Sequence, residues 1–126
     1  MRKTVLPALL LATALPYLVG LGDSTIWDAN EAFYAGTARE MIESGDYVNP
    51  SFNYQPRFNK PVLSYWAVAA SYRMFGVSER SERLPIAAAA LVLIATAYGL
   101  GRAAGSGEAG LYAAMALAST PRFLMF

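Results

Sequence analysis

Two apolar runs that contain no charged residue, residues 5–22 and residues 84–100, constrain the fold of this chain most strongly. A helix rises about 1.5 Å per residue and the hydrocarbon core of a bilayer is about 30 Å thick, so each run is close to the length that crosses a membrane. A third apolar run begins at residue 109. Backbone polar groups in lipid must bond within their own segment, so the runs should be helical. The sequence therefore predicts an all-α, polytopic integral membrane protein with three transmembrane helices.

The amino-acid composition agrees with a membrane protein. Hydrophobic residues make up 56% of the chain and charged residues 15%, whereas soluble domains carry about 25% charged residues. The net charge of +1 provides no electrostatic basis for binding nucleic acid. The chain has no cysteine and no histidine, so a disulfide is excluded. The sequence predicts no definite cofactor. A divalent metal ion held by carboxylates is the one cofactor that it leaves possible.

Basic residues at the ends of the runs predict their orientation. Arg2 and Lys3 precede the first run, and Arg102 follows the second. Because basic residues next to membrane spans tend to stay in the cytoplasm, we expect a cytoplasmic N-terminus and an extracytoplasmic first loop. This arrangement predicts a multi-pass membrane protein whose first loop lies outside the cytoplasm.

The spans divide the chain into five predicted segments: a transmembrane helix over residues 1–22, an extracytoplasmic loop over 23–83, a transmembrane helix over 84–102, a cytoplasmic turn over 103–108, and a truncated transmembrane helix over 109–126. A cleaved signal peptide is the alternative for the first run, but its small-residue motif falls too early, which favours a retained anchor. The third run has no closing polar segment, so we expect an N-terminal fragment that is inactive alone. The alternative is a small, complete protein with three segments.

Two interfacial helices are expected in the loop, over about residues 29–44 and 61–75. The first carries a one-sided apolar stripe, and a helix of this kind next to a membrane anchor should lie flat in the interface. The second is apolar but too short to span, and it contains Arg73. Proline and asparagine in residues 46–60 oppose regular structure. We therefore expect an extended or turn-rich connection there, with room for a short hairpin.

Asp28 and Glu31 open the first of these helices. Their spacing is that of a capping box, in which the first residue caps the helix and the second returns a hydrogen bond. The same spacing places two carboxylates on one side of the first helical turn, where one of them can act as a general base toward an acceptor hydroxyl. The two interpretations are compatible.

Lys60 precedes the second helix, which begins at Pro61 in this prediction. A lysine ammonium next to the positive end of a helix dipole can bind a phosphate, and Arg57 could join it. Arg80 and Arg83, at the outer end of the second span, could also face anionic headgroups. The alternatives are a lysine that extends its ammonium to the membrane surface and arginines that only anchor the helix end.

The residues between the two tryptophans, 27–66, resemble the first periplasmic loop of the polytopic glycosyltransferases of the C superfamily. The most similar group is the bacterial aminoarabinose (lipid A) transferases and their protein mannosyltransferase relatives. The matching residues are Glu31, Tyr34-Ala35, Arg39-Glu40-Met41, Ser44-Gly45-Asp46, Pro50, Lys60-Pro61, Tyr65-Trp66 and Arg83-Leu84-Pro85. The resemblance covers nearly the whole chain.

The resemblance implies an enzyme that transfers a sugar, with inversion, from a polyprenyl-phosphate donor to a lipid A-like, glycan or protein acceptor at the outer face of the inner membrane. The family's loop aspartate activates the acceptor and its lysine binds the donor phosphate. The family's Asp-Glu pair falls on Asn30-Glu31, so Glu31 or Asp28 should take the aspartate's role. Residues expected to bind the donor phosphate are Lys60, Arg57 and Arg83, and residues expected near the substrate are Asn30, Tyr34, Arg39 and Tyr65.

The sequence leaves two other classes of function as alternatives. A transporter or channel component would need charged residues or breaks within its spans, and the runs here are nearly free of charge. A non-catalytic membrane scaffold or assembly protein with an aromatic outer loop is the second alternative. The expected partners of the enzyme are the sugar donor, the acceptor and membrane lipids.

Overall fold

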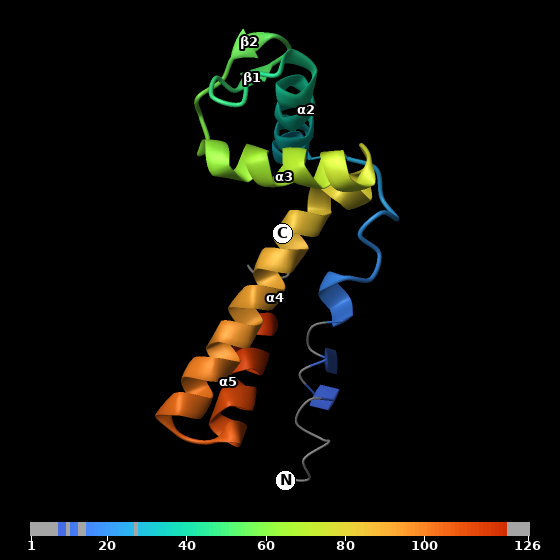
Figure 1. The fold of residues 1–126 in the computed structure, drawn as a ribbon. Coiled ribbons are helices and arrows are strands. Elements are labelled where there is room, and N and C mark those ends of the chain that lie inside the picture. The colour runs from blue at the N-terminus through green and yellow to red at the C-terminus, as the bar shows by residue number, and fades with distance from the viewer. Residues whose placement is uncertain (1–7, 10, 13–14, 27, 121–126) are drawn as a thin grey trace. The chain divides into compact units, whose positions relative to one another are not determined.

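The computed structural model describes residues 8–9, 11–12, 15–26 and 28–120, and these are mostly helical (Figure 1). The elements are a 3₁₀ helix η1 (Leu15–Tyr17), α2 (Ala29–Ser44), β1 (Ser51–Phe52), β2 (Gln55–Pro56), α3 (Val62–Phe75), α4 (Glu79–Ala104) and α5 (Gly107–Ala118). They belong to two compact units. Unit 1 comprises Met1–Val19 and Ile86–Phe126, and unit 2 comprises Gly20–Pro85.

Within the described residues, α4 alone is long and apolar enough to cross a membrane, and its most apolar 18-residue stretch has a mean hydropathy of 1.9. Much of the first predicted span lies outside the described residues. Residues 15–22 form the 3₁₀ helix η1 and a turn, so the predicted helix does not continue as a regular α-helix to residue 22. Pro16 has no N–H to donate, and Gly20 adopts a φ of 78°. The number of spans stays a prediction.

The third predicted span corresponds to α5, which begins at Gly107. Its start lies two residues before the predicted 109 because Ser106 caps the helix. The Ala109 amide donates to the Ser106 Oγ at 3.2 Å. Residues 121–126 of the predicted span lie outside the described residues.

The helix α4 begins five residues before the predicted start at residue 84. Ser78 sets this start, because its Oγ accepts from the Ser81 amide at 3.2 Å and its carbonyl accepts from the Glu82 amide at 3.1 Å. Pro85 consequently lies inside the helix, where its ring removes one backbone donor. The apolar run therefore predicts where the apolar part of α4 begins, whereas the Ser78 cap determines where the helix itself begins.

Unit 2 is built on the packing of α2 against α3 (Figure 1). Its core consists of Ala38 from α2 with Val68, Ala69 and Tyr72 from α3. The predicted range of α2 is confirmed, and it ends where Gly45 adopts a left-handed φ of 73° and donates to the Met41 carbonyl at 3.0 Å. The apolar stripe predicted for α2 forms the buried face, with Thr37, Ala38 and Met41 buried.

The connection between α2 and α3 contains the short hairpin for which the sequence left room. Strands β1 and β2 pair antiparallel, with Phe52 opposite Gln55. Asn53 and Tyr54 both have positive φ, 52° and 58°, as a tight two-residue turn requires. Glu40 of α2 accepts from the Ser51 Oγ at 2.5 Å and from the Tyr54 amide at 3.2 Å, so one carboxylate fastens the hairpin to the helix.

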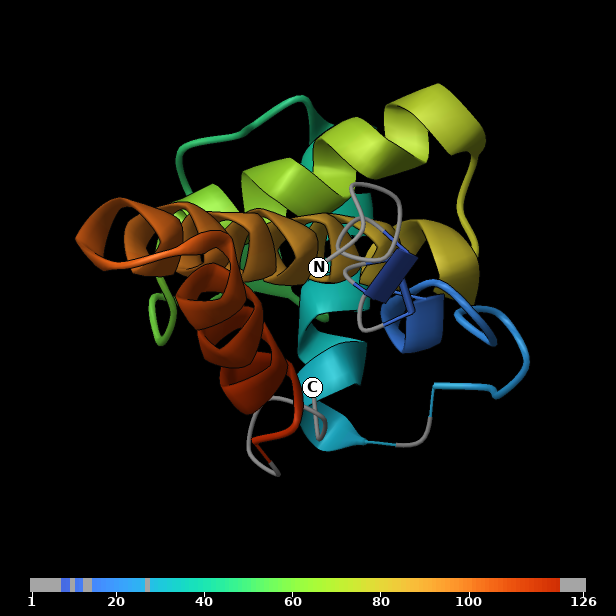
Figure 2. The ribbon, with the colours of Figure 1, turned by 90° about the horizontal axis from the view of Figure 1, so that it is seen from below.

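In unit 1, α5 turns back beside the second half of α4 (Figures 1 and 2). A Cβ atom added at Gly101 would lie 2.8 Å from the Cα of Gly110, so the two helices approach at two glycines. Nearby, Ile94 packs with Ala114 and Ala118. Small residues that allow close helix approach are typical of packing in lipid.

We expect Gly101→Ala and Gly110→Ala to destabilise the α4–α5 pair by about 1–3 kcal/mol each, since the new methyl group meets backbone atoms that cannot rotate away. At Gly110, the added Cβ would lie 2.6 Å from the Tyr98 carbonyl oxygen. The matched control is Gly99→Ala, where the added Cβ has nothing within 4 Å. Thermal unfolding in mild detergent measures the effect. Equal behaviour of Gly99→Ala and Gly101→Ala would contradict the close approach.

Candidate functional site

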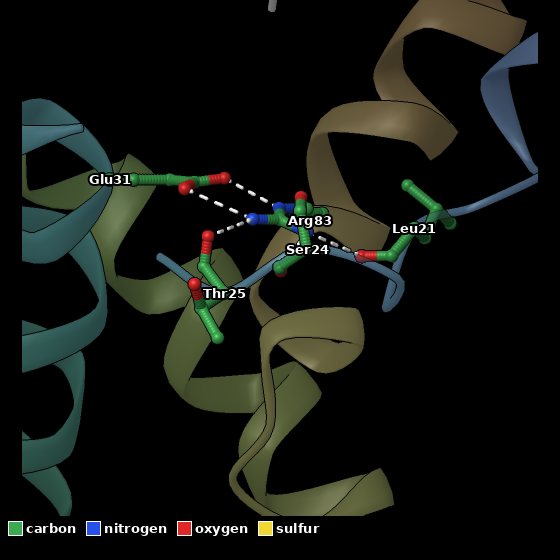
Figure 3. Close-up of polar contacts among 5 residues, drawn as sticks. All are labelled: Leu21, Ser24, Thr25, Glu31 and Arg83. Atoms are coloured by element: carbon green, nitrogen blue, oxygen red, sulfur yellow. Dashed lines mark hydrogen bonds and ion pairs between the residues drawn. The ribbon is translucent and has the colours of Figure 1, made fainter. Parts of the chain in front are cut away.

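The first turn of α2 carries the two acidic residues singled out from the sequence. Asp28 is the N-cap, and its Oδ1 accepts from the Asn30 amide at 3.0 Å. Asp28 is exposed, and no bond to its second oxygen is found among the described residues. Glu31 does not return the capping-box hydrogen bond. Both of its oxygens instead accept from Arg83 at the start of α4, as Figure 3 shows.

Arg83 makes five hydrogen bonds and so uses all five N–H groups of its guanidinium. The Nε and one Nη bond Glu31 at 2.5 and 3.1 Å. The remaining N–H groups bond the carbonyls of Leu21 at 2.9 Å, Ser24 at 2.9 Å and Thr25 at 3.4 Å (Figure 3). No N–H group is left to bind a phosphate, so this geometry favours a structural role for Arg83 over the predicted donor-phosphate role.

Glu82, the residue next to Arg83, is a buried acid that the sequence reasoning missed. Its side chain is fully buried, and neither carboxyl oxygen has a hydrogen-bond partner among the described residues. The charged groups that act on it are Glu31, Arg83 and Glu79. Its position in the sequence does not predict this burial, because an acidic residue in the first turn of a helix ordinarily lies on the surface and interacts favourably with the helix dipole.

A second cluster surrounds Arg57, which follows the hairpin. Its guanidinium carbon lies 3.5 Å from the centre of the Phe33 ring and 5.9 Å from that of Phe52. The two phenylalanine rings meet edge to face, with centroids 4.9 Å apart. The Arg57 Nε is buried and has no hydrogen-bond partner within the described part of the chain.

Tyr65 of α3 lies in the core beneath this region and is fully buried. Burial raises the pKa of its phenol, and the positive charge of Arg57 opposes that rise. Its ring lies 5.5 Å from that of Tyr34, which is half-buried against the same core. The two tyrosines therefore pack between α2 and α3, and their substrate-proximal role stays a prediction.

The other predicted site residues are exposed. Lys60 precedes α3, and it forms no hydrogen bond or ion pair with the described residues. The N-cap of α3, Pro61, provides no side-chain hydrogen bond. The backbone N–H of Asn30 donates a hydrogen bond to the side chain of Asp28. Arg39 forms an ion pair with Glu43 at 2.8 Å on the exposed side of α2.

The structure joins Glu31 to Arg83 but does not join Lys60 to Asp28 or Glu31 by any bond in the described residues. The first turns of α2 and α3 lie apart in both views (Figures 1 and 2). Within the described part of the chain, no three acidic, histidine or cysteine side chains are grouped to hold a metal ion. A carboxylate-bound metal therefore stays a prediction.

We expect Arg83→Lys to lower the free energy of unfolding by about 1.5–3 kcal/mol, because lysine keeps the charge but loses the planar set of five donors that bonds Glu31 and three backbone carbonyls. The control is Arg39→Lys, in a pair whose side chains are 65% and 45% exposed, and we expect it to have little effect. Circular dichroism during thermal unfolding in detergent gives the comparison. A loss of stability that is no larger for Arg83→Lys than for Arg39→Lys would contradict the assigned role.

Glu82→Gln should raise the free energy of unfolding by about 1–3 kcal/mol in alkaline buffer, because it removes a buried acid whose oxygens lack partners while it preserves the side chain's size. Glu43→Gln, on the exposed side of α2, is the matched control and should change stability little. The same unfolding assay serves for both. A strongly destabilised Glu82→Gln protein would mean that the carboxylate has a partner it needs.

Solved structures and relatives with similar sequences define the family. The chain is similar over 99% of its length to ArnT from Cupriavidus metallidurans in the apo state, with a TM-score of 0.88 and 28% identity, and it covers 24% of that chain. The same protein bound to undecaprenyl phosphate matches 80% of the chain, with a TM-score of 0.72 and 31% identity, and 19% of that chain is covered.

Two relatives are undecaprenyl phosphate-alpha-4-amino-4-deoxy-L-arabinose arabinosyl transferases. The one from Shewanella sediminis is 42% identical over 53% of the chain and 12% of the relative. The one from Pseudomonas aeruginosa is 34% identical over 80% of the chain and 18% of the relative. The chain thus spans less than a fifth of the length of the curated relatives it matches.

The family model described as dolichyl-phosphate-mannose-protein mannosyltransferase matches residues 59–126, more than half of the chain. Together with the likeness to ArnT, this match confirms the resemblance to the glycosyltransferases of the C superfamily that the loop motifs indicate. The chain belongs to the dolichyl-phosphate-mannose-protein mannosyltransferase family.

Proposed function

We propose that this chain is part of a membrane glycosyltransferase that uses a polyprenyl-phosphate sugar donor. The observation that carries the proposal is the likeness of nearly the whole chain to ArnT, of which one structure contains undecaprenyl phosphate. The enzyme transfers the sugar with inversion to a lipid A-like, glycan or protein acceptor. Transfer takes place at the outer face of the inner membrane, where residues 23–83 meet the headgroups.

The donor's phosphate needs a positive partner, because it leaves with the negative charge when the sugar is transferred. Lys60 is exposed, and its ammonium is free of any ion pair in the described residues. It stands immediately before α3, whose first N–H groups receive no side-chain cap from Pro61. A compact ammonium beside a positive helix end suits a phosphate group. We therefore assign donor-phosphate binding to Lys60.

The acceptor hydroxyl must lose a proton as it attacks the sugar, and a positioned carboxylate can take it. Both oxygens of Glu31 are engaged by Arg83, so Glu31 is suited to hold the start of α2 in place. Asp28, one turn earlier, is exposed and uses one oxygen for the Asn30 amide. We assign acceptor activation to Asp28 and its positioning to the Glu31–Arg83 pair.

We expect Asp28→Asn in the full-length protein to lower kcat about 10²- to 10⁴-fold, because the amide keeps the helix cap but cannot accept the proton.

We expect Lys60→Met to lower kcat/KM for the sugar donor by about 10- to 100-fold, mainly through KM, since a charged hydrogen bond to phosphate is lost. Transfer from a radiolabelled polyprenyl-phosphate sugar in membranes measures both. Glu43→Gln serves as the control. Full activity in both variants would leave a membrane scaffold as the better description.

A further inference from the structure

The first turn of α4, which precedes the apolar run at residue 84, buries an acid that no described residue bonds. The side chain of Glu82 has no exposed surface, and neither carboxyl oxygen has a hydrogen-bond partner among the described residues. The neighbouring Ser81 is also buried, but its hydroxyl pairs with that of Ser78 at 2.8 Å. A neutral carboxyl group tolerates such surroundings far better than a carboxylate, which needs donors to replace the water it has lost. The cost of burying Glu82 therefore depends on whether it carries a proton.

Charged or titratable groups from α2, α3 and α4 act on Glu82. Glu31 belongs to α2, Glu79 and Arg83 to α4, and Tyr72 to α3. The two acids oppose the ionisation of Glu82, whereas the guanidinium favours it. Burial and, to a smaller extent, the charge of Glu82 raise the pKa of Tyr72 to about 12. The Tyr72 phenol therefore stays neutral at physiological pH and offers no charge to balance a carboxylate.

The cation that acts on Glu82 is already engaged. All five N–H groups of Arg83 are used, two on Glu31 at the start of α2 and three on backbone carbonyls. An ionised Glu82 would be a second carboxylate next to the same guanidinium, without donors of its own among the described residues. It can gain a donor only by drawing an N–H group away from its present partner or by admitting water. Either change loosens the contacts that fix the first turn of α2.

We propose that Glu82 is a proton-binding positioning residue, which as a neutral acid leaves Arg83 to Glu31 and as a carboxylate competes with Glu31 for it. The part of this proposal that concerns catalysis rests on the proposed function, because Asp28 caps the helix turn that Glu31 anchors. Loss of the Glu82 proton loosens that turn and takes Asp28 out of position. Sugar transfer should therefore lose rate on the alkaline side of its pH profile.

The first test follows thermal unfolding of the full-length protein in mild detergent between about pH 5 and pH 9. Because burial without donors penalises the carboxylate in the folded protein alone, wild-type stability should fall as the pH rises. The melting temperature of Glu82→Gln should match wild type at acid pH and exceed it by about 2–6 °C at alkaline pH. Glu82→Met, which adds no amide donors, gives a second comparison. Glu43→Gln, on the exposed side of α2, is the matched control and should follow wild type.

Two further measurements on the same proteins locate the effect. Hydrogen–deuterium exchange in the first turn of α2 should be about tenfold faster in wild type than in Glu82→Gln at about pH 9, and equal at about pH 5. Comparing the two proteins at one pH cancels the intrinsic dependence of exchange on pH. Between neutral pH and about pH 9, kcat for sugar transfer should fall about tenfold more in wild type than in Glu82→Gln.

The outcomes separate this proposal from the proposed function. If Glu82→Gln and Glu82→Met keep the wild-type pH dependence of stability, or are less stable than wild type at every pH, the proton-binding role is overturned. If stability and exchange change as expected while the pH profile of kcat does not, the positioning of Asp28 by this route is overturned. If wild-type protein transfers no sugar from a polyprenyl-phosphate donor, the proposed function fails, and the stability and exchange measurements still decide the role of Glu82.

Discussion

The bonds of Arg83 are the interaction on which the arrangement of unit 2 depends. One side chain at the start of α4 holds the first turn of α2 through Glu31 and the chain before it through the carbonyls of Leu21, Ser24 and Thr25. These partners lie 52 to 62 residues away in sequence. The guanidinium can join them because its five donors point in fixed directions in one plane. Asp28 is placed as a consequence, since it caps the helix turn that Glu31 anchors.

Both units rely on close approach at glycine. In unit 2, Phe52 packs on Gly36, and this contact places the ring that faces Arg57. In unit 1, the backbones of α4 and α5 meet at Gly101 and Gly110. A methyl group at any of these positions would meet a ring or a backbone atom within 3 Å. Between α4 and α5, dispersion contacts over short distances take the place of the hydrophobic driving force, which is weak between apolar helices in lipid.

The chemistry of unit 2 follows from which polar groups are already paired. Glu31 and Arg83 satisfy each other, so both are suited to fix structure. Asp28 and Lys60 retain groups that no described residue bonds, and these are the groups that a hydroxyl acceptor and a phosphate-linked sugar would need. Glu82 is the exception, because its buried oxygens have no described partner and take no direct part in the proposed transfer. Stability measurements on Glu82→Gln address that residue directly.

Local patterns in the sequence determined the helices of the loop and the family. The apolar stripe, the capping Asp28 and Gly45 fix α2 over Ala29–Ser44, because each acts within a few residues along the chain. The motifs around Lys60 and Pro61 likewise identify the glycosyltransferase family without any tertiary information. The 3₁₀ helix at Leu15–Tyr17 and the start of α4 at Glu79 depart from the predicted bounds, because Pro16 and Ser78 act on the helix ends in a way that apolar length does not show.

Only the tertiary structure decided how the charged residues are used. Sequence spacing cannot show that Glu31 pairs with Arg83, that Glu82 is buried, or that Phe33 lies beneath Arg57. Each of these facts depends on contacts between segments that are distant in the chain, and the energy of a charge depends on the groups that surround it in space. The sequence therefore determined which ionisable groups the loop contains, and packing between α2, α3 and the start of α4 decided which of them remain free to act.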